Sequence, residues 1–288
     1  DYGQALLIEA TSKNSILDNV IFEYGDMFMI YIIPMVQIQG ANVKISNAIF
    51  RKSRDMALSL IDSNSVIENC IFEDNIMTAL SIEGGQMKIK NSQFKNNSVG
   101  VEIRNNSKVI FENNYFINNR APLFIGLPNE INFDESNKLL DNDLNGILIF
   151  SQSFLEDTVV VLPKINWPYL ILDNVLSIEQ GTLIINSGVV IKGQMHNGDP
   201  LIHIYKDGNL IINGTENEPV IITSFNDDNI LGDTNNNGLL TQPAKNDWSN
   251  IFIQGNANLK WLKLRYGSDK PLIPDTPANI LQSNVSIE

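Results

Sequence analysis

The sequence repeats itself every 22 residues between residues 41 and 125. Three residues after each repeated phenylalanine comes a small polar residue, and four units keep the same order. The recurring positions are Phe50, Phe72, Phe94 and Phe116; Asn47, Asn69, Asn91 and Asn113; and Ser53, Asn75, Asn97 and Asn119. A fixed period of this length is typical of a solenoid, in which each unit is one turn of a coil.

Inside each unit apolar residues alternate with polar ones, for example around Ile67 in one unit and around Ile89 in the next. This alternation predicts short strands with one buried face. The chain contains 40 Ile and 39 Asn but only 10 Ala, a composition that favours strands and turns over helices. Stacked coils would place Ile, Val and Phe inside. Asn would stand at the corners, where it tolerates left-handed backbone angles and can hydrogen-bond along the stack. The predicted fold class is therefore all-β: a right-handed parallel β-helix of about 22 residues per coil.

We expect one β-helix over residues 1–288, with regular coils at 41–125, less regular coils at 126–288 and a protruding loop at 224–250. We expect about eleven to thirteen coils, which the spacing of about 4.8 Å between stacked strands converts to a length of about 50–60 Å. Tyr24-Gly25 and Tyr266-Gly267 begin similar segments 242 residues apart, which is eleven periods. Because both ends fall within a coil, we expect the chain to be part of a longer protein.

The units containing VIENCIFEDN and KVIFENNYFINN resemble the right-handed parallel β-helix repeats of the pectate-lyase-like superfold. The later stretches LPKINWPYLILDNVLSIEQGTLIINSGVVIKG and GNLIINGTENEPVIITS resemble β-helix modules of large secreted or surface-anchored bacterial proteins. This resemblance covers most of the chain. It specifies a fold rather than an activity, because proteins on this fold include lyases, hydrolases and adhesins.

Catalytic signatures of such enzymes do not stand out. Polygalacturonase-like hydrolases carry paired Asp residues with Gly-His-Gly and Arg-Ile-Lys segments; neither segment occurs here, and the two histidines, His196 and His203, lack acidic residues at matching positions. Asp62, Glu83 and Arg104 recur 21 residues apart and could line a substrate groove, but a solvated sheet edge with alternating charges is the favoured interpretation. We therefore assign no catalytic residue.

The most specific local motif is the segment Asp233-Thr-Asn-Asn-Asn-Gly238, which matches the start of a calcium-binding loop. Closely spaced oxygen ligands that turn around a glycine can wrap a hard cation. The twelfth position is Ala244 instead of the usual Glu. We predict a structural Ca²⁺ site, or alternatively a metal-free turn. The candidate ligands are Asp233, Asn235, Asn237, Asp227, Asp228 and Asp247.

Aromatic side chains in the second half could stack on sugars, although alternating strands favour core or anchoring roles for some of them. They are Trp167, Tyr169, Tyr205, Trp248, Trp261 and Tyr266. The single cysteine, Cys70, precludes an intrachain disulfide and is interpreted as a small structural hydrophobe.

The formal charge of −13 argues against nucleic acid as a partner, and the longest apolar run, residues 27–36, is too short for membrane insertion. The leading hypothesis is a non-catalytic structural or adhesin-like module, secreted or on a bacterial cell surface. Its partners would be an extracellular glycan or protein, other domains of the same chain, or a secretion or surface-anchoring complex. The alternatives are a polysaccharide-active lyase or hydrolase, a carbohydrate-binding module, and a filament subunit.

Overall fold

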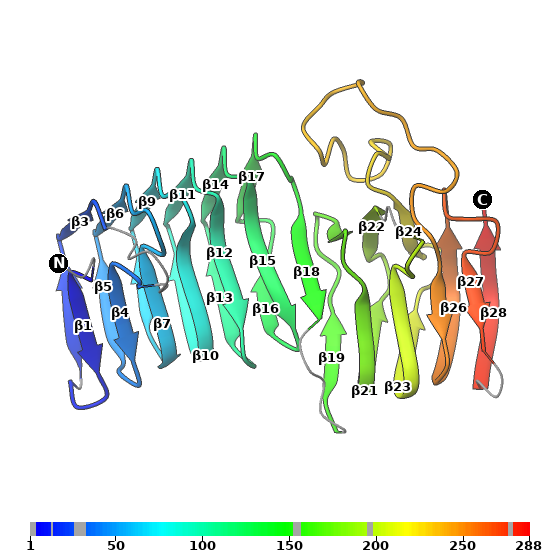
Figure 1. The fold of residues 1–288 in the computed structure, drawn as a ribbon, viewed down its shortest axis with the longest axis horizontal. Helices are drawn as coiled ribbons and strands as arrows, with labels where there is room; N and C mark the ends of the chain where they lie inside the picture. Colours follow the sequence, from blue (N-terminus) through cyan, green and yellow to red (C-terminus); the bar gives the residue numbers. More distant parts are fainter. Residues whose placement is uncertain (1–3, 13, 26–32, 152–156, 195–197, 276–278) are drawn as a thin grey trace. The chain divides into compact units, whose positions relative to one another are not determined.

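The computed structural model describes residues 4–12, 14–25, 33–151, 157–194, 198–275 and 279–288. Those residues form parallel β-strands joined by turns, without a helix among them (Figure 1). Their contacts divide into two compact units. Unit 1 comprises residues 1–125 and 129–145, and unit 2 comprises residues 126–128 and 146–288.

Unit 1 is a coil with three strands per turn, and each strand pairs in parallel with its counterpart one turn later. The first sheet contains β1 (Leu6–Glu9), β4 (Val36–Gln39), β7 (Leu58–Ser63), β10 (Thr78–Lys90), β12 (Val99–Arg104) and β15 (Ala121–Leu127). The second contains β2 (Ser15–Asp18), β5 (Val43–Ser46), β8 (Val66–Glu68), the end of β10, β13 (Lys108–Glu112) and β16 (Glu130–Phe133). The third contains β3 (Ile21–Glu23), β6 (Ile49–Arg51), β9 (Ile71–Glu73), β11 (Gln93–Lys95), β14 (Tyr115–Ile117) and β17 (Lys138–Leu140).

The 22-residue repeat sets the register of these sheets. Phe72 stands between Phe50 and Phe94, and Ile89 stands beside Ile67, as the repeat predicts. Four of the repeated asparagines have positive φ angles and so take the left-handed conformation at a coil corner: Asn47 (51°), Asn69 (54°), Asn91 (52°) and Asn113 (55°). Asparagine adopts this region more readily than most residues, which explains its abundance.

A second, buried set of asparagines forms a ladder along unit 1. The side-chain amide of Asn75 donates to the Oδ1 of Asn97 at 2.9 Å, and the ladder continues through Asn119 to Asn142 with two bonds of 3.0 Å. Each Oδ1 also accepts the backbone N–H of the preceding ladder residue. The corner role and the ladder role expected of asparagine therefore belong to two different sets of positions.

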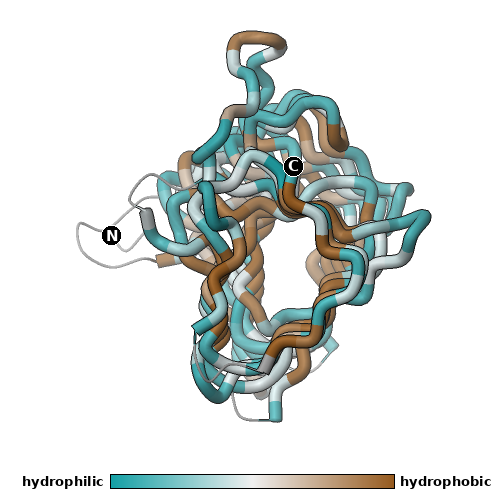
Figure 2. Tube along the Cα trace, turned by 90° about the vertical axis from the view of Figure 1, so that its right-hand side faces the viewer, coloured by the Kyte–Doolittle hydropathy of each residue, from teal (hydrophilic) through white to brown (hydrophobic). Residues whose placement is uncertain are grey.

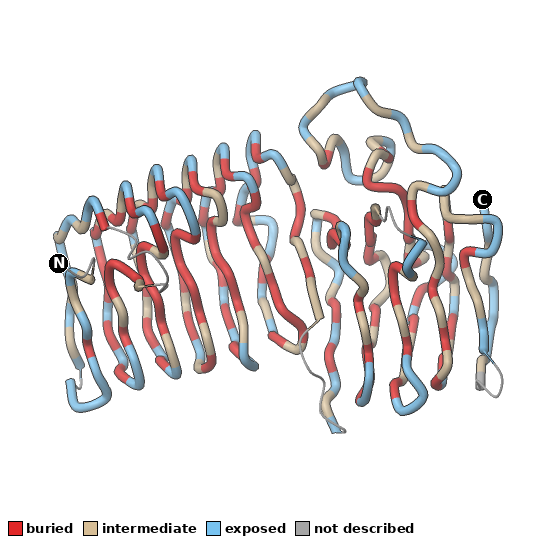
Figure 3. Tube along the Cα trace, viewed as in Figure 1, coloured by how far each residue is buried: buried red, intermediate tan, exposed pale blue. Residues whose placement is uncertain are grey.

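The interior of unit 1 is a phenylalanine stack. Phe50, Phe72, Phe94 and Phe116 are fully buried, and their successive ring centroids lie 4.9, 4.7 and 4.9 Å apart. Along the trace, hydrophobic and hydrophilic positions alternate (Figure 2), and buried segments recur at matching places of successive coils of unit 1 (Figure 3). Burial of these rings supplies a large share of the hydrophobic stabilisation of the unit.

Unit 2 is also a parallel coil, but its turns vary in length. One series of paired strands consists of β18 (Ile147–Ser151), β20 (Tyr169–Leu172), β22 (Val190–Gln194), β24 (Val220–Ser224) and the ends of β26 (Asn256–Leu264) and β28 (Asn279–Ile287). A second series runs through β19 (Val159–Leu162), β21 (Leu176–Asn186), β23 (Ile202–Asn213), β26 and β28. The third joins the starts of β21 and β23 to β25 (Ile251–Ile253) and β27 (Leu272–Pro274).

The chain has about 10 turns of about 23 residues, fewer turns than the eleven to thirteen expected. The difference arises from individual long turns in both units: in unit 1 Leu6 pairs with Val36, 30 residues later, and the longest turn lies in unit 2. Val220 pairs with Leu262, for instance, because residues 225–250 form an excursion between β24 and β25 (Figure 1). This excursion is the protruding loop anticipated at 224–250.

Candidate functional site

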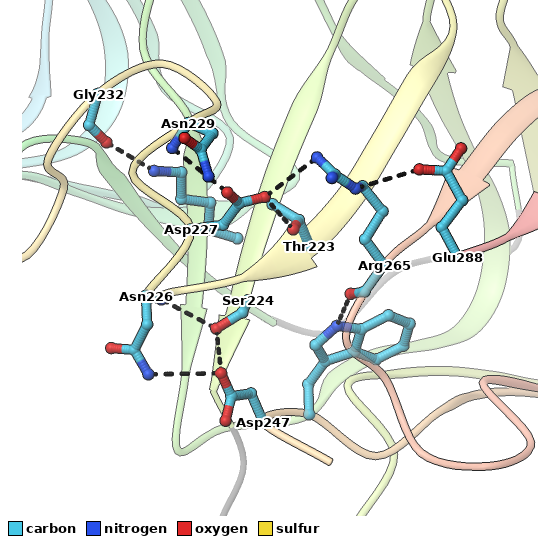
Figure 4. Close-up of polar contacts among 11 residues, drawn as sticks. Thr223, Ser224, Asn226, Asp227, Asn229, Gly232, Asp247, Arg265 and Glu288 are labelled. Atoms are coloured by element: carbon cyan, nitrogen blue, oxygen red, sulfur yellow. Dashed lines mark hydrogen bonds and ion pairs between the residues drawn. The ribbon is translucent and has the colours of Figure 1, made fainter. Parts of the chain in front are cut away.

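The base of the 224–250 loop contains a network of polar contacts (Figure 4). Trp248 anchors the loop: its side chain is fully buried and its indole Nε1 donates to the carbonyl oxygen of Arg265 at 2.8 Å. Phe225, at the other end of the loop, is also buried. The loop is therefore attached to the coil at both ends by apolar contacts.

Lys192 reaches from β22 into the loop. Its side chain is completely buried, and its ammonium donates to the carbonyl oxygen of Gly232 at 2.9 Å and to the hydroxyl of Thr234 at 2.5 Å. Burial lowers the pKa of Lys192 to about 8, although the nearby carboxylates of Asp227 and Asp228 act in the opposite direction. This lysine was not predicted from the sequence. A single cation inside the apolar run of β22 was the available signal.

Two of the predicted metal ligands are engaged elsewhere. Asp227 is fully buried; its Oδ2 accepts the hydroxyl of Thr223 at 2.7 Å and lies 3.4 Å from a guanidinium nitrogen of Arg265. Asp247 accepts from the hydroxyl of Ser224 at 2.5 Å and from the backbone N–H of Ala244 at 2.9 Å. Both carboxylates thus fasten the loop base to the neighbouring strand end and turn.

The motif residues Asp233, Asn235 and Asn237 form a tight turn. The Asp233 carboxylate accepts the backbone N–H of Gly238 at 2.6 Å through Oδ2 and that of Asn237 at 3.2 Å through Oδ1. The amide groups of Asn235 and Asn237 both donate to the hydroxyl of Thr241, at 3.2 and 2.9 Å. Thr241, absent from the predicted set, thereby fixes the direction of both amides.

Between residues 228 and 237, four oxygen atoms are buried and accept no hydrogen bond: both carboxylate oxygens of Asp228 and the Oδ1 atoms of Asn235 and Asn237. Burial and the nearby charge of Asp233 raise the pKa of Asp228, while Lys192 acts to lower it. Within the described ranges, no three His, Cys, Asp or Glu residues gather as metal ligands. The unpartnered set is instead a mixture of carboxylate and amide oxygens.

The possible groove of Asp62, Glu83 and Arg104 is not assembled as a line. Glu83 stands beside Arg104 in the sheet, but its neighbour on the other side is Ile61, because the step there is 22 rather than 21 residues. Arg104 forms an ion pair with Glu102 of its own strand. Asp62 itself has a positive φ of 47°.

Of the two histidines, His203 shares a hydrogen bond with Gln254, in which its Nε2 lies 3.1 Å from the amide Oε1. Its ring also stacks on Tyr205, with the ring centroids 3.7 Å apart. His196 lies outside the described residues. Among the aromatic candidates, Tyr169 and Trp248 are buried and belong to the core, whereas Tyr205 is exposed. The remaining three, Trp167, Trp261 and Tyr266, are partly buried.

Cys70 is buried at the inside of unit 1. Its thiol lies 3.3 Å from the carbonyl oxygen of Glu68 and 3.7 Å from that of Ile45. Burial raises the pKa of Cys70 to about 11, which keeps the thiol protonated at neutral pH. This agrees with a packing role.

Unit 1 also has a shallow groove of about 510 Å³ over its second sheet. It crosses β2, β5, β8 and β10. Its lining is Asn14, Ser15, Ile16, Asn42, Val43, Lys44, Asn64, Val66, Glu68 and Lys90. Ile16 is 66% exposed there, and the ammonium of Lys90 is paired with Glu68 at 2.9 Å.

Comparison with known protein families gives two overlapping matches. The model described as a right-handed β-helix region matches residues 34–166, and the model of a pectate-lyase-like β-helix domain matches residues 155–269. No curated protein and no solved structure matches the chain. In the part of the chain that the structure describes, no helix is long and apolar enough to cross a membrane.

Proposed function

Because the chain belongs to the right-handed parallel β-helix proteins, we propose that it is a structural or adhesin-like module of a large bacterial protein, secreted or displayed on the cell surface. The observation that carries this proposal is the way unit 1 uses its polar groups to join coil to coil. The buried Asn ladder from Asn75 to Asn142 attaches four successive coils to one another through contacts that do not depend on the outer faces.

The outer faces of unit 1 support the same reading. Their charged side chains pair between neighbouring coils, as Lys95 does with Glu73 at 2.7 Å and Lys88 with Glu112 at 2.8 Å. Arg51 lies between Glu23 and Glu73, at 2.7 and 3.7 Å. Single exposed pairs contribute little to stability, but pairs along a stack hold neighbouring coils in register. Coils that are held in register along their stack are suitable for a structural module that separates other parts of a protein.

The test is an in-frame deletion of this segment from the full-length protein on its native cells. We expect the truncated protein still to reach the surface, detected with an antibody against another segment, while adhesion to the host or matrix falls. Purified protein incubated with a panel of acidic and neutral polysaccharides should release no new reducing or unsaturated ends. Sustained turnover would replace this proposal with an enzymatic one.

The groove over the second sheet favours a second candidate, carbohydrate binding. Its volume lies within the range of small-ligand sites, and its asparagine amides and Lys44 are suitable partners for hydroxyl and carboxylate groups of a sugar. The discriminating experiment is a glycan array with wild type and Lys44→Ala. Binding that the variant loses would support this function, and an array without signal would refute it.

A further inference from the structure

We propose that the 224–250 loop contains a Ca²⁺ site built from Asp228, Asp233, Asn235 and Asn237. The observation that points to a cation is the set of four buried oxygens without a hydrogen-bond donor, two on Asp228 and one on each asparagine. A buried acceptor without a partner costs about 1–3 kcal/mol. Four of them in one short segment are chemically explained by a bound cation.

The surrounding hydrogen bonds orient these oxygens as ligands. Thr241 takes the N–H groups of Asn235 and Asn237, which leaves both Oδ1 atoms directed away from that hydroxyl. Asn235 also donates to the Oδ1 of Asn226 at 3.1 Å, so its amide is held from two sides. Each Asp233 oxygen accepts one backbone N–H and retains a lone pair for a metal.

The chemistry of this set selects a hard divalent cation. All its side-chain donors are oxygens, two carboxylates balance a charge of +2, and Ca²⁺ accepts irregular sets of carboxylate and amide oxygens completed by main-chain carbonyls and water. Mg²⁺ requires a more regular octahedron and releases its water reluctantly.

Lys192 does not replace the metal. Its ammonium is directed to Gly232 and Thr234, and the Asp228 oxygens remain without a donor although the lysine lies close enough to influence them electrostatically. Asp227 and Asp247 are left out of the proposed set because neither has a buried oxygen without a partner, and the Oδ2 of each already binds Thr223 and Arg265 or Ser224. The site is thus smaller than the six-residue set predicted from the sequence.

The experiment compares wild type with Asp228→Asn and the matched control Asp269→Asn. Both variants lose one carboxylate of the same length, but Asp269 is exposed and pairs with Lys245 outside the site. The protein is stripped with a chelator, which is then removed. It is titrated with CaCl₂ in a calorimeter and melted with and without Ca²⁺.

We expect saturable heat near one Ca²⁺ per chain and a higher melting temperature for wild type and Asp269→Asn. Asp228→Asn should bind at least about tenfold more weakly, a loss of about 1.4 kcal/mol. In chelator this variant should melt at or above the wild-type temperature, because an unpaired buried carboxylate has been removed. That second result shows that weakened binding is not a folding defect.

Limited proteolysis locates the effect. Leu239 and Leu240 are 84% and 87% exposed within the loop, so chymotrypsin should cut there, and Ca²⁺ should slow cleavage in wild type but not in Asp228→Asn. Absence of heat and of a melting shift in wild type would overturn the proposal. Equal Ca²⁺ binding by Asp228→Asn and wild type would overturn it as well, because the ion would then lie elsewhere.

Discussion

Replacing Asn97 by alanine should destabilise unit 1 far more than its uncharged side chain suggests. The Oδ1 of Asn97 accepts the backbone N–H of Asn75 at 3.1 Å, and its Nδ2 donates to the carbonyl oxygen of Phe72 at 3.1 Å. Alanine leaves the buried N–H of Asn75 unpartnered, whereas the carbonyl oxygen of Phe72 keeps its bond within the sheet pairing of Phe72 with Phe94. At about 1–3 kcal/mol for one buried unpartnered group, the expected loss of unfolding free energy is about 1–3 kcal/mol.

The assay is urea unfolding of wild type, Asn97→Ala and a control, Gln93→Ala, followed by the loss of β-sheet circular dichroism. Gln93 belongs to the same coil but its side chain is exposed, so its truncation should change the free energy by less than about 0.5 kcal/mol. Asn97→Ser should fall between them, since Ser53 stands at the equivalent position where the ladder begins. Equal stability of Asn97→Ala and Gln93→Ala would refute the argument that the ladder holds the coils together.

Two further predictions concern titratable groups. Burial raises the pKa of Cys70 to about 11, so the thiol of the folded protein should react with Ellman's reagent at pH 8 only as fast as the coil around it unfolds locally. Immediate reaction in native buffer would contradict this prediction. Burial lowers the pKa of Lys192 to about 8, so above that pH the unfolded chain binds more protons than the folded protein does. The free energy of unfolding should therefore rise from pH 8 to 10 more steeply in wild type than in Lys192→Met. Parallel curves for the two proteins would contradict the assigned burial of Lys192.

The coils of unit 1 were predictable because a strict repeat encodes register directly. Phe94 follows Phe72 by one period, so their stacking required no knowledge of loops. The repeat also indicated that asparagine would both turn corners and bond along the stack, but it could not separate the two roles. That separation depends on which side chains point inward, as those of Asn75 and Asn97 do while Asn69 turns a corner.

The polar network under the loop was only partly predictable. The Asp233 motif identified the turn, since its spacing determines which backbone N–H groups its carboxylate can reach. Lys192, by contrast, precedes its loop partner Gly232 by about 40 residues, and Arg265 follows its partner Asp227 by about 40 residues. Because the turns of unit 2 vary in length, the sequence does not show that these residues meet. Asp62 misses Glu83 for a different reason: unit 1 keeps its regular 22-residue step there, so Ile61 is the sheet neighbour of Glu83.

The central claim is that stacked turns of fixed register build this protein. Its most direct test is to measure the unfolding transition of a variant that lacks residues 69–90. That segment is one full turn, because Lys90 is the sheet neighbour of Glu68 and the cut joins Glu68 to Asn91, the equivalent of Asn69. The account predicts a β-rich protein with a cooperative transition, whereas removal of residues 69–79 alone, half a turn, should prevent unit 1 from folding. Equal disruption by both deletions would contradict the account.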